Sequence, residues 1–122
     1  MKKIEMINVM ENERYFSSCG NYTLEKGHKD LNSKEEWLLF CQKNLIDSNE
    51  NINKLKEIYN IEFHDIDQQV KDLILDLEID ISCANRDGLP KYAEKCQKEL
   101  QYILKKHNQL RFNRYGYPIF ED

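Results

Sequence analysis

The sequence predicts an α+β fold: a small N-terminal antiparallel sheet followed by about four helices, dominated by a C-terminal antiparallel helical hairpin. Three observations support this prediction. Short β-prone runs separated by turn residues fill 1–33, apolar residues recur at intervals of three and four between 66 and 107, and Gly88 and Pro90 interrupt that helical pattern. A chain of 122 residues can form one modest core, so we expect a single domain, 1–122.

The segment 1–33 is the strand and turn region. Apolar and polar residues alternate over 4–9, and further β-prone runs occupy 14–18 and 22–24. Two or three antiparallel strands fit this pattern best. The isoleucine and methionine content leaves a helix over 3–10 open as the alternative.

Two short helices are expected over 34–60. Ser33 and Glu36 have the spacing of a capping box, in which the two side chains accept hydrogen bonds from backbone N–H groups at a helix start. The apolar residues that follow recur at helical spacing: Trp37, Leu38, Cys41 and Leu45. We therefore expect one helix over 34–46 and a shorter one over 52–59.

The segment 65–110 predicts the helical hairpin. The apolar stripe of its first helix consists of Ile66, Val70, Leu73, Leu77, Ile81 and Ala84. The stripe of its second helix consists of Leu89, Ala93, Cys96, Leu100, Ile103 and His107. Gly88 ends the first helix and Pro90 begins the second, because proline is favoured in a first helical turn. Leu75 and Ile79 lie on the opposite side of the first helix, so a second neighbour, which in a homodimer is another copy, should cover them.

Charge is distributed unevenly along this hairpin. From 62 to 87 there are eight acidic and two basic residues, whereas 91–117 contains seven basic and two acidic ones. Like charges line up on each helix: Asp72, Asp76 and Asp80 on the first, Lys91, Lys95 and Lys98 on the second. Such rows are either solvated faces or docking surfaces for an oppositely charged partner, and they are our candidate partner-binding residues.

The aromatic tail, 111–122, has no helical pattern and allows two interpretations. Arg111, Arg114, Tyr115 and Tyr117 could stack on a base and hold phosphates, which makes them an alternative ligand-binding group. The commoner fate of such aromatic residues is packing on the core of a small domain.

The sequence gives little support for a metal site, a cofactor site or a catalytic site. Glu62, His64, Asp65 and Asp67 could hold a divalent cation, but acids also gather at helix starts because the helix dipole favours them there, so we expect no metal. The chain has neither Gly-x-Ser-x-Gly nor a P-loop, so we expect no catalytic residues, no cofactor and no enzyme activity. The four cysteines form no C-x-x-C pair and are expected to stay reduced.

Composition narrows the function classes. A net charge of −4 makes nucleic acid an unlikely partner, and the apolar runs are too short for a membrane span or a signal peptide, so a cytoplasmic protein is expected. Abundant lysine, asparagine and isoleucine are typical of AT-rich bacterial or phage genes. We expect a non-catalytic protein-binding protein, most simply an inhibitor or immunity-type neutraliser of a toxin or of a host or defence factor. The alternatives are a nucleotide or small-molecule binding (sequestering) protein that uses the tail, and a structural or assembly subunit that dimerises through the hairpin.

Overall fold

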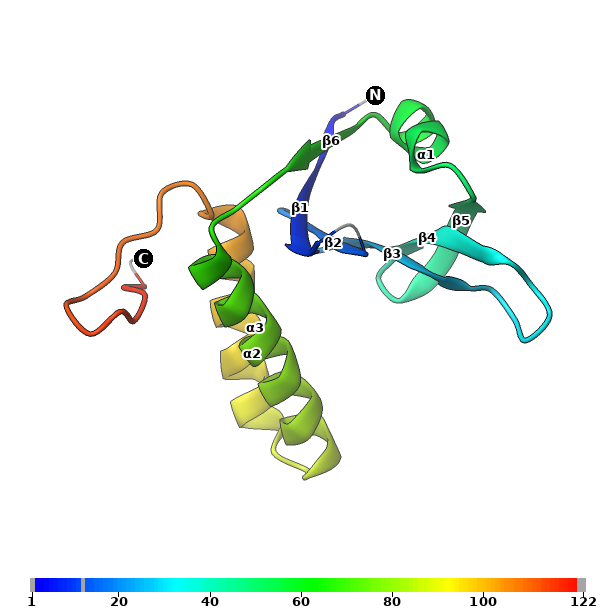
Figure 1. The fold of residues 1–122 in the computed structure, drawn as a ribbon. Coiled ribbons are helices and arrows are strands. Elements are labelled where there is room, and N and C mark those ends of the chain that lie inside the picture. Colours follow the sequence, from blue (N-terminus) through cyan, green and yellow to red (C-terminus); the bar gives the residue numbers. More distant parts are fainter. Residues whose placement is uncertain (1, 12, 121–122) are drawn as a thin grey trace. The chain divides into compact units, whose positions relative to one another are not determined.

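The computed structural model describes residues 2–11 and 13–120. They divide into two compact units, which meet in sequence between Asp65 and Ile66. The N-terminal unit contains a six-stranded sheet and one helix, and the C-terminal unit contains two helices and the tail (Figure 1). The α+β class is therefore confirmed, although the described residues form three helices and not about four.

The sheet is mixed, with the strand order β5-β4-β3-β2-β1-β6. Its strands are β1 (Ile4–Met10), β2 (Arg14–Ser17), β3 (Tyr22–His28), β4 (Glu35–Cys41), β5 (Asn44–Asn49) and β6 (Ile61–His64). The first five strands pair antiparallel in chain order. The first three of them, β1 to β3, are the strands predicted within 1–33. β6 then returns to the other edge and pairs parallel to β1.

The predicted helix over 34–46 is wrong, because this segment is the β4–β5 hairpin. Every residue of β4 pairs with a residue of β3, and this pairing overrides the helical spacing of the apolar residues. The two residues between the strands, Gln42 and Lys43, both have positive φ angles, of 50° and 72°. Tight hairpin turns favour this conformation, but asparagine and glycine usually supply it, so Gln-Lys gives little sequence signal.

The predicted helix over 52–59 is confirmed as α1 (Ile52–Tyr59). The Asn51 side chain caps its start by accepting the N–H of Asn53, and Asn60 ends it in the left-handed conformation with φ of 54°. α1 contributes Leu55 to the core of the N-terminal unit, and Tyr59 donates a 2.9 Å hydrogen bond to Asp47 of β5. The buried residues of this core are Met6, Tyr15, Leu24, Trp37, Leu39, Leu55 and Ile61.

The C-terminal unit contains the predicted helical pair, α2 (Gln68–Arg86) and α3 (Pro90–Lys105). Gly88, with φ of 71°, lies between them, and Pro90 occupies the first turn of α3 as expected. The buried residues of the two helices are Val70, Ile74, Ala84, Ala93, Cys96, Leu100, Ile103 and Leu104. Leu73 and Leu77 of the predicted stripe are only half-buried, whereas Ile74 is fully buried. Within the described residues, no helix combines the length and the apolar character that crossing a membrane requires.

Candidate binding surfaces

The first part of the tail, 111–119, forms a small β-hairpin, a structure that the sequence interpretation missed. Phe112 and Pro118 form its antiparallel bridge, and the N–H of Ile119 donates to the carbonyl of Arg111 at 2.9 Å. Hydrogen bonds of this kind fix the backbone on both sides of the turn.

Asn113 organises the turn of this hairpin. Its Oδ1 accepts the backbone N–H groups of Tyr115 and Tyr117, at 2.9 and 3.1 Å. Gly116 has φ of 84°, a conformation that glycine adopts without strain. An asparagine three residues before a glycine, between aromatic residues, was the available sequence signal for this turn.

Two contacts hold the tail hairpin against the helices of the same unit. The ring of Phe120 packs edge-on against Tyr102 of α3, with 5.4 Å between the centroids. The Gln69 side-chain amide of α2 donates to the carbonyl of Gly116 at 3.3 Å. These contacts fix the position of the tail hairpin relative to α2 and α3.

The tyrosines of the tail hairpin point into solvent. Tyr115 is 70% exposed and Tyr117 is 66% exposed, so core packing does not account for these two side chains. Phe120 packs against Tyr102 but is itself 42% exposed. The Arg114 guanidinium lies over the Tyr115 ring, 4.8 Å from its centroid, and donates to the Tyr115 hydroxyl at 2.6 Å. Arg111 is exposed as well, so the tail presents two cations and two tyrosines.

The acidic row lies exposed along α2. Asp72, Asp76 and Asp80 all face solvent, and Asp72 accepts a 2.9 Å hydrogen bond from the Gln68 side chain. Asp80 is close enough to Tyr92 of α3 to affect it. The pKa of Tyr92 is raised, chiefly by its interaction with the Cys96 side chain and to a smaller extent by the charge of Asp80. The acidic row therefore borders a partly exposed tyrosine.

The lysine row lies exposed along α3. Lys98 forms an ion pair with Glu94, one helical turn away, at 3.4 Å, whereas Lys91 and Lys95 face solvent. Among the ion pairs of the described residues, none joins this row to the acidic row of α2. The two rows therefore remain separate charged surfaces.

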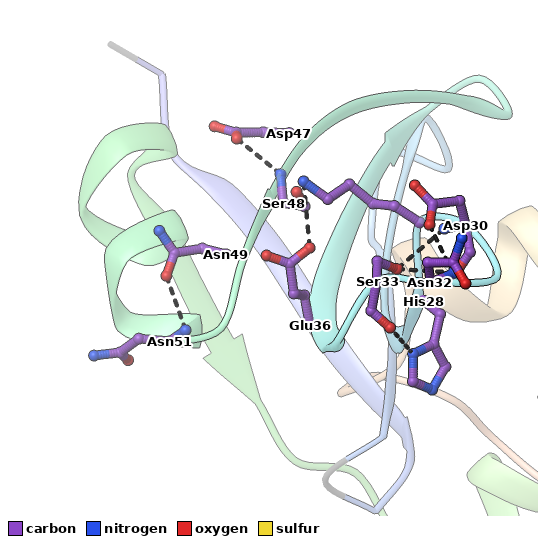
Figure 2. Close-up of polar contacts among 10 residues, drawn as sticks. His28, Asp30, Asn32, Ser33, Glu36, Asp47, Ser48, Asn49 and Asn51 are labelled. Atoms are coloured by element: carbon purple, nitrogen blue, oxygen red, sulfur yellow. Dashed lines mark hydrogen bonds and ion pairs between the residues drawn. The ribbon is translucent and has the colours of Figure 1, made fainter.

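A third polar group surrounds the turn between β3 and β4 (Figure 2). Ser33 Oγ accepts the N–H of Asp30 at 3.1 Å and donates to its carbonyl, while Asp30 Oδ1 accepts the N–H of Asn32 at 2.9 Å. Glu36 pairs with Lys29 at 3.4 Å. The predicted capping box of Ser33 and Glu36 is therefore wrong, because the segment that follows is strand β4 and not a helix. Ser33 instead stabilises the turn before this strand.

The acid-rich group at 62–67 is spread over strand β6, the connector that follows it and the start of helix α2. Glu62 and His64 belong to strand β6, Asp65 accepts a 3.0 Å hydrogen bond from the Asn8 side chain, and Asp67 is the N-cap position of α2. The helix-dipole explanation of this group therefore applies to Asp67 and not to Glu62 or His64.

All four cysteines are free thiols. Cys96 is buried and Cys19 is exposed, whereas Cys41 and Cys83 are intermediate.

No protein-family model, no curated protein and no solved structure matches this chain.

Proposed function

We propose that this chain is a non-catalytic protein-binding protein, an inhibitor or immunity-type neutraliser of a toxin or of a host or defence factor. We place its action in the cytoplasm of a bacterium or of a phage-infected cell. The observation that carries the proposal is the tail hairpin 111–119, which holds Tyr115 and Tyr117 in solvent on an ordered backbone. Tyrosine and arginine are enriched among the residues that dominate protein–protein binding energy.

Order in the tail hairpin favours binding to a protein partner. Association costs free energy wherever it immobilises chain, so a backbone already fixed by Asn113 loses less on binding. Tyrosine adds a large contact area with only two rotatable side-chain angles. The contacts of Phe120 with Tyr102 and of Gln69 with Gly116 keep this surface beside α2 and α3.

The charged rows supply a second part of the proposal. Asp72, Asp76 and Asp80, and separately Lys91, Lys95 and Lys98, are exposed and can act on an approaching partner. Charges of this kind chiefly raise the association rate and discriminate between partners. We assign one of the two rows to the partner interface.

The experiment begins with a pull-down from the native cell using the full chain, followed by stopped-flow association with the purified partner. Tyr115→Ala with Tyr117→Ala should weaken binding by about 30-fold, the effect of losing a binding hot spot. Leu31→Ala is the matched control, because Leu31 is fully exposed in the N-terminal unit. Unchanged affinity in the double tyrosine variant would remove the tail hairpin from the interface.

Charge reversal tests the rows with the same partner. Asp76→Lys with Asp80→Lys, or Lys95→Glu with Lys98→Glu, should slow association by more than about threefold at low salt and flatten its salt dependence. Lys34→Glu, an exposed position in the N-terminal unit, is the control. If neither reversal changes the association rate, both rows are solvated faces.

Nucleotide or small-molecule sequestration through Arg111, Arg114, Tyr115 and Tyr117 is the second candidate. The exposure of both tyrosines and of both arginines favours it. The stacking of Arg114 on Tyr115 counts against it, because each group already occupies a face that a base would need. Quenching of tyrosine fluorescence by ATP or GTP at micromolar concentration, absent in Arg114→Ala, would support this candidate over a protein partner.

Self-association through α2 is the third candidate. Ile79 is 60% exposed, so the face on which Leu75 and Ile79 lie is not fully covered. A structural subunit would sediment as a dimer whose dissociation constant rises strongly in Ile79→Glu. A monomer at all accessible concentrations would eliminate this candidate.

A further inference from the structure

Strand β6 lies beside β1 at one edge of the sheet (Figure 1). This parallel pairing brings together three side chains of residue types that can bind a metal. Glu5 lies opposite Glu62 in the register, and Ile7 lies opposite His64. Side chains two residues apart on a strand share a face, so Glu62 and His64 point to the same side, and Glu5 joins them from the neighbouring strand.

The donor atoms of this group lie at separations close to those around a bound ion. His64 Nε2 is 3.2 Å from Glu62 Oε1 and 3.9 Å from Glu5 Oε1, and the three ligand atoms lie within 4.8 Å of one another. Zinc bonds to nitrogen and oxygen are about 2.0–2.2 Å long, so neighbouring ligands lie roughly 3–3.6 Å apart. Small rotations of these side chains would bring the three donor atoms to the separations found around a bound zinc ion.

The second oxygen of each carboxylate is already held by another group. Glu5 Oε2 accepts a 3.3 Å hydrogen bond from Ser18 Oγ, and Glu62 Oε2 is paired with the Lys3 ammonium. Both carboxylates therefore turn Oε1 toward His64. Outer partners of this kind orient metal ligands, and they distinguish this group from a mere accumulation of acids. The Lys3 hydrogen bond and charge also lower the pKa of Glu62.

We infer that Glu5, Glu62 and His64 bind one divalent transition-metal ion of the Zn²⁺ type, leaving at least one coordination position open. Two carboxylates and one imidazole suit Zn²⁺ or Co²⁺, whereas Mg²⁺ and Ca²⁺ prefer oxygen ligands alone. The expectation from the sequence that no metal binds rests on residues 62–67 alone, because Glu5 is far from this segment along the chain. The inference is independent of the proposed function.

The test is calorimetric titration of the chelator-treated full chain with ZnCl₂ near neutral pH. One Zn²⁺ per chain is expected. His64→Ala and the nearly isosteric Glu5→Gln should each weaken binding by about 10-fold or more. His107→Ala is the matched control, because His107 lies beyond α3 and bonds the Leu104 carbonyl. Circular dichroism checks that each variant is folded.

Co²⁺ absorption identifies the ligands. Coordination by Glu5, Glu62 and His64 gives weak visible bands without the near-ultraviolet charge-transfer band of a cobalt thiolate. A strong thiolate band would place the ion on a cysteine and overturn the inference. Absence of Zn²⁺ binding up to millimolar concentration would do the same, as would unchanged binding in both folded variants.

Discussion

Individual side chains contribute very unequally to the stability of the N-terminal unit. Leu39 has no exposed surface and lies in the core with Tyr15, Leu24 and Trp37, whereas Leu31 in the β3–β4 turn is fully exposed. Burial removes apolar surface from water, so the same residue type contributes strongly at one position and almost nothing at the other.

Leu39→Ala should lower the free energy of unfolding by about 2–5 kcal/mol, because it removes buried contacts and leaves a cavity. Leu31→Ala should change it by less than about 0.5 kcal/mol, as is usual at the surface. Urea unfolding followed by Trp37 fluorescence measures both, since Trp37 belongs to the same core. Equal effects of the two substitutions would show that Leu39 is not in the core.

A second residue, Tyr59, is expected to make the free energy of unfolding depend on pH. Its pKa is raised, first by burial and then by the hydrogen bond that it donates to Asp47. A pKa raised by folding means that the protonated hydroxyl stabilises the fold. This contribution is complete below the unfolded tyrosine pKa of about 10 and is lost as the pH rises through the higher folded value.

Tyr59→Phe should therefore cost about 0.5–1.5 kcal/mol at neutral pH, the net value of one hydrogen bond. The difference between wild type and variant should shrink as the pH is raised above about 10. Urea unfolding at neutral and alkaline pH measures this difference directly. A gap that stays constant over this range would mean that Tyr59 ionisation is not linked to folding.

At the scale of elements, the tail hairpin and helix α2 are stabilised in different ways, the first by local hydrogen bonds and the second by burial of apolar side chains. The tail hairpin 111–119 depends on polar bonds: Asn113 accepts two backbone N–H groups in its turn. The helix α2 depends on its buried face, where Ile74 is fully buried while Ile79, on the other side, is 60% exposed.

Asn113→Ala should open the tail hairpin without unfolding the helices. The N–H groups of Tyr115 and Tyr117 lose their acceptor, so their hydrogen exchange should speed up by about tenfold or more, the equivalent of about 1.4 kcal/mol. Asn108→Ala, an exposed position outside the hairpin, is the control. Unchanged exchange would mean that the bridge between Phe112 and Pro118 holds the turn alone.

On α2, Ile74→Ala should cost about 2–5 kcal/mol and Ile79→Ala less than about 1 kcal/mol. Circular dichroism at 222 nm during urea unfolding follows the helices and measures both. A large loss from Ile79→Ala in a concentration-dependent transition would instead indicate that a second copy covers this residue.

At the scale of the whole molecule, each of the two units contains its own reporter. Trp37 lies in the core of the N-terminal unit, and the thiol of Cys96 is buried in the C-terminal unit. Chains that divide into separate compact units need not unfold in a single step.

Leu39→Ala should move the urea transition seen by Trp37 fluorescence to lower denaturant than the transition seen by thiol labelling of Cys96. Mass spectrometry of the labelled peptide separates Cys96 from the exposed Cys19. Coincident transitions in this variant would show that the two units unfold as one cooperative block.

Local patterns determined much of this protein without reference to tertiary structure. The three-and-four spacing of apolar residues, with Gly88 and Pro90 between the two runs, was enough to predict α2 and α3. The same signals located α1, and the charge rows on the hairpin followed from spacing alone. In each case the interactions lie within a few residues along the chain, where sequence spacing is also spatial distance.

Only tertiary structure decided the elements that depend on distant partners. The run Trp37-Leu38-Leu39-Phe40 suits a helix or a strand equally, and pairing with β3 selected the strand. β6 exists because β1 is beside it, and the same pairing brings Glu5 to Glu62 and His64. The partner of a strand is chosen by hydrogen bonds and burial across the fold, which spacing along one chain segment does not contain.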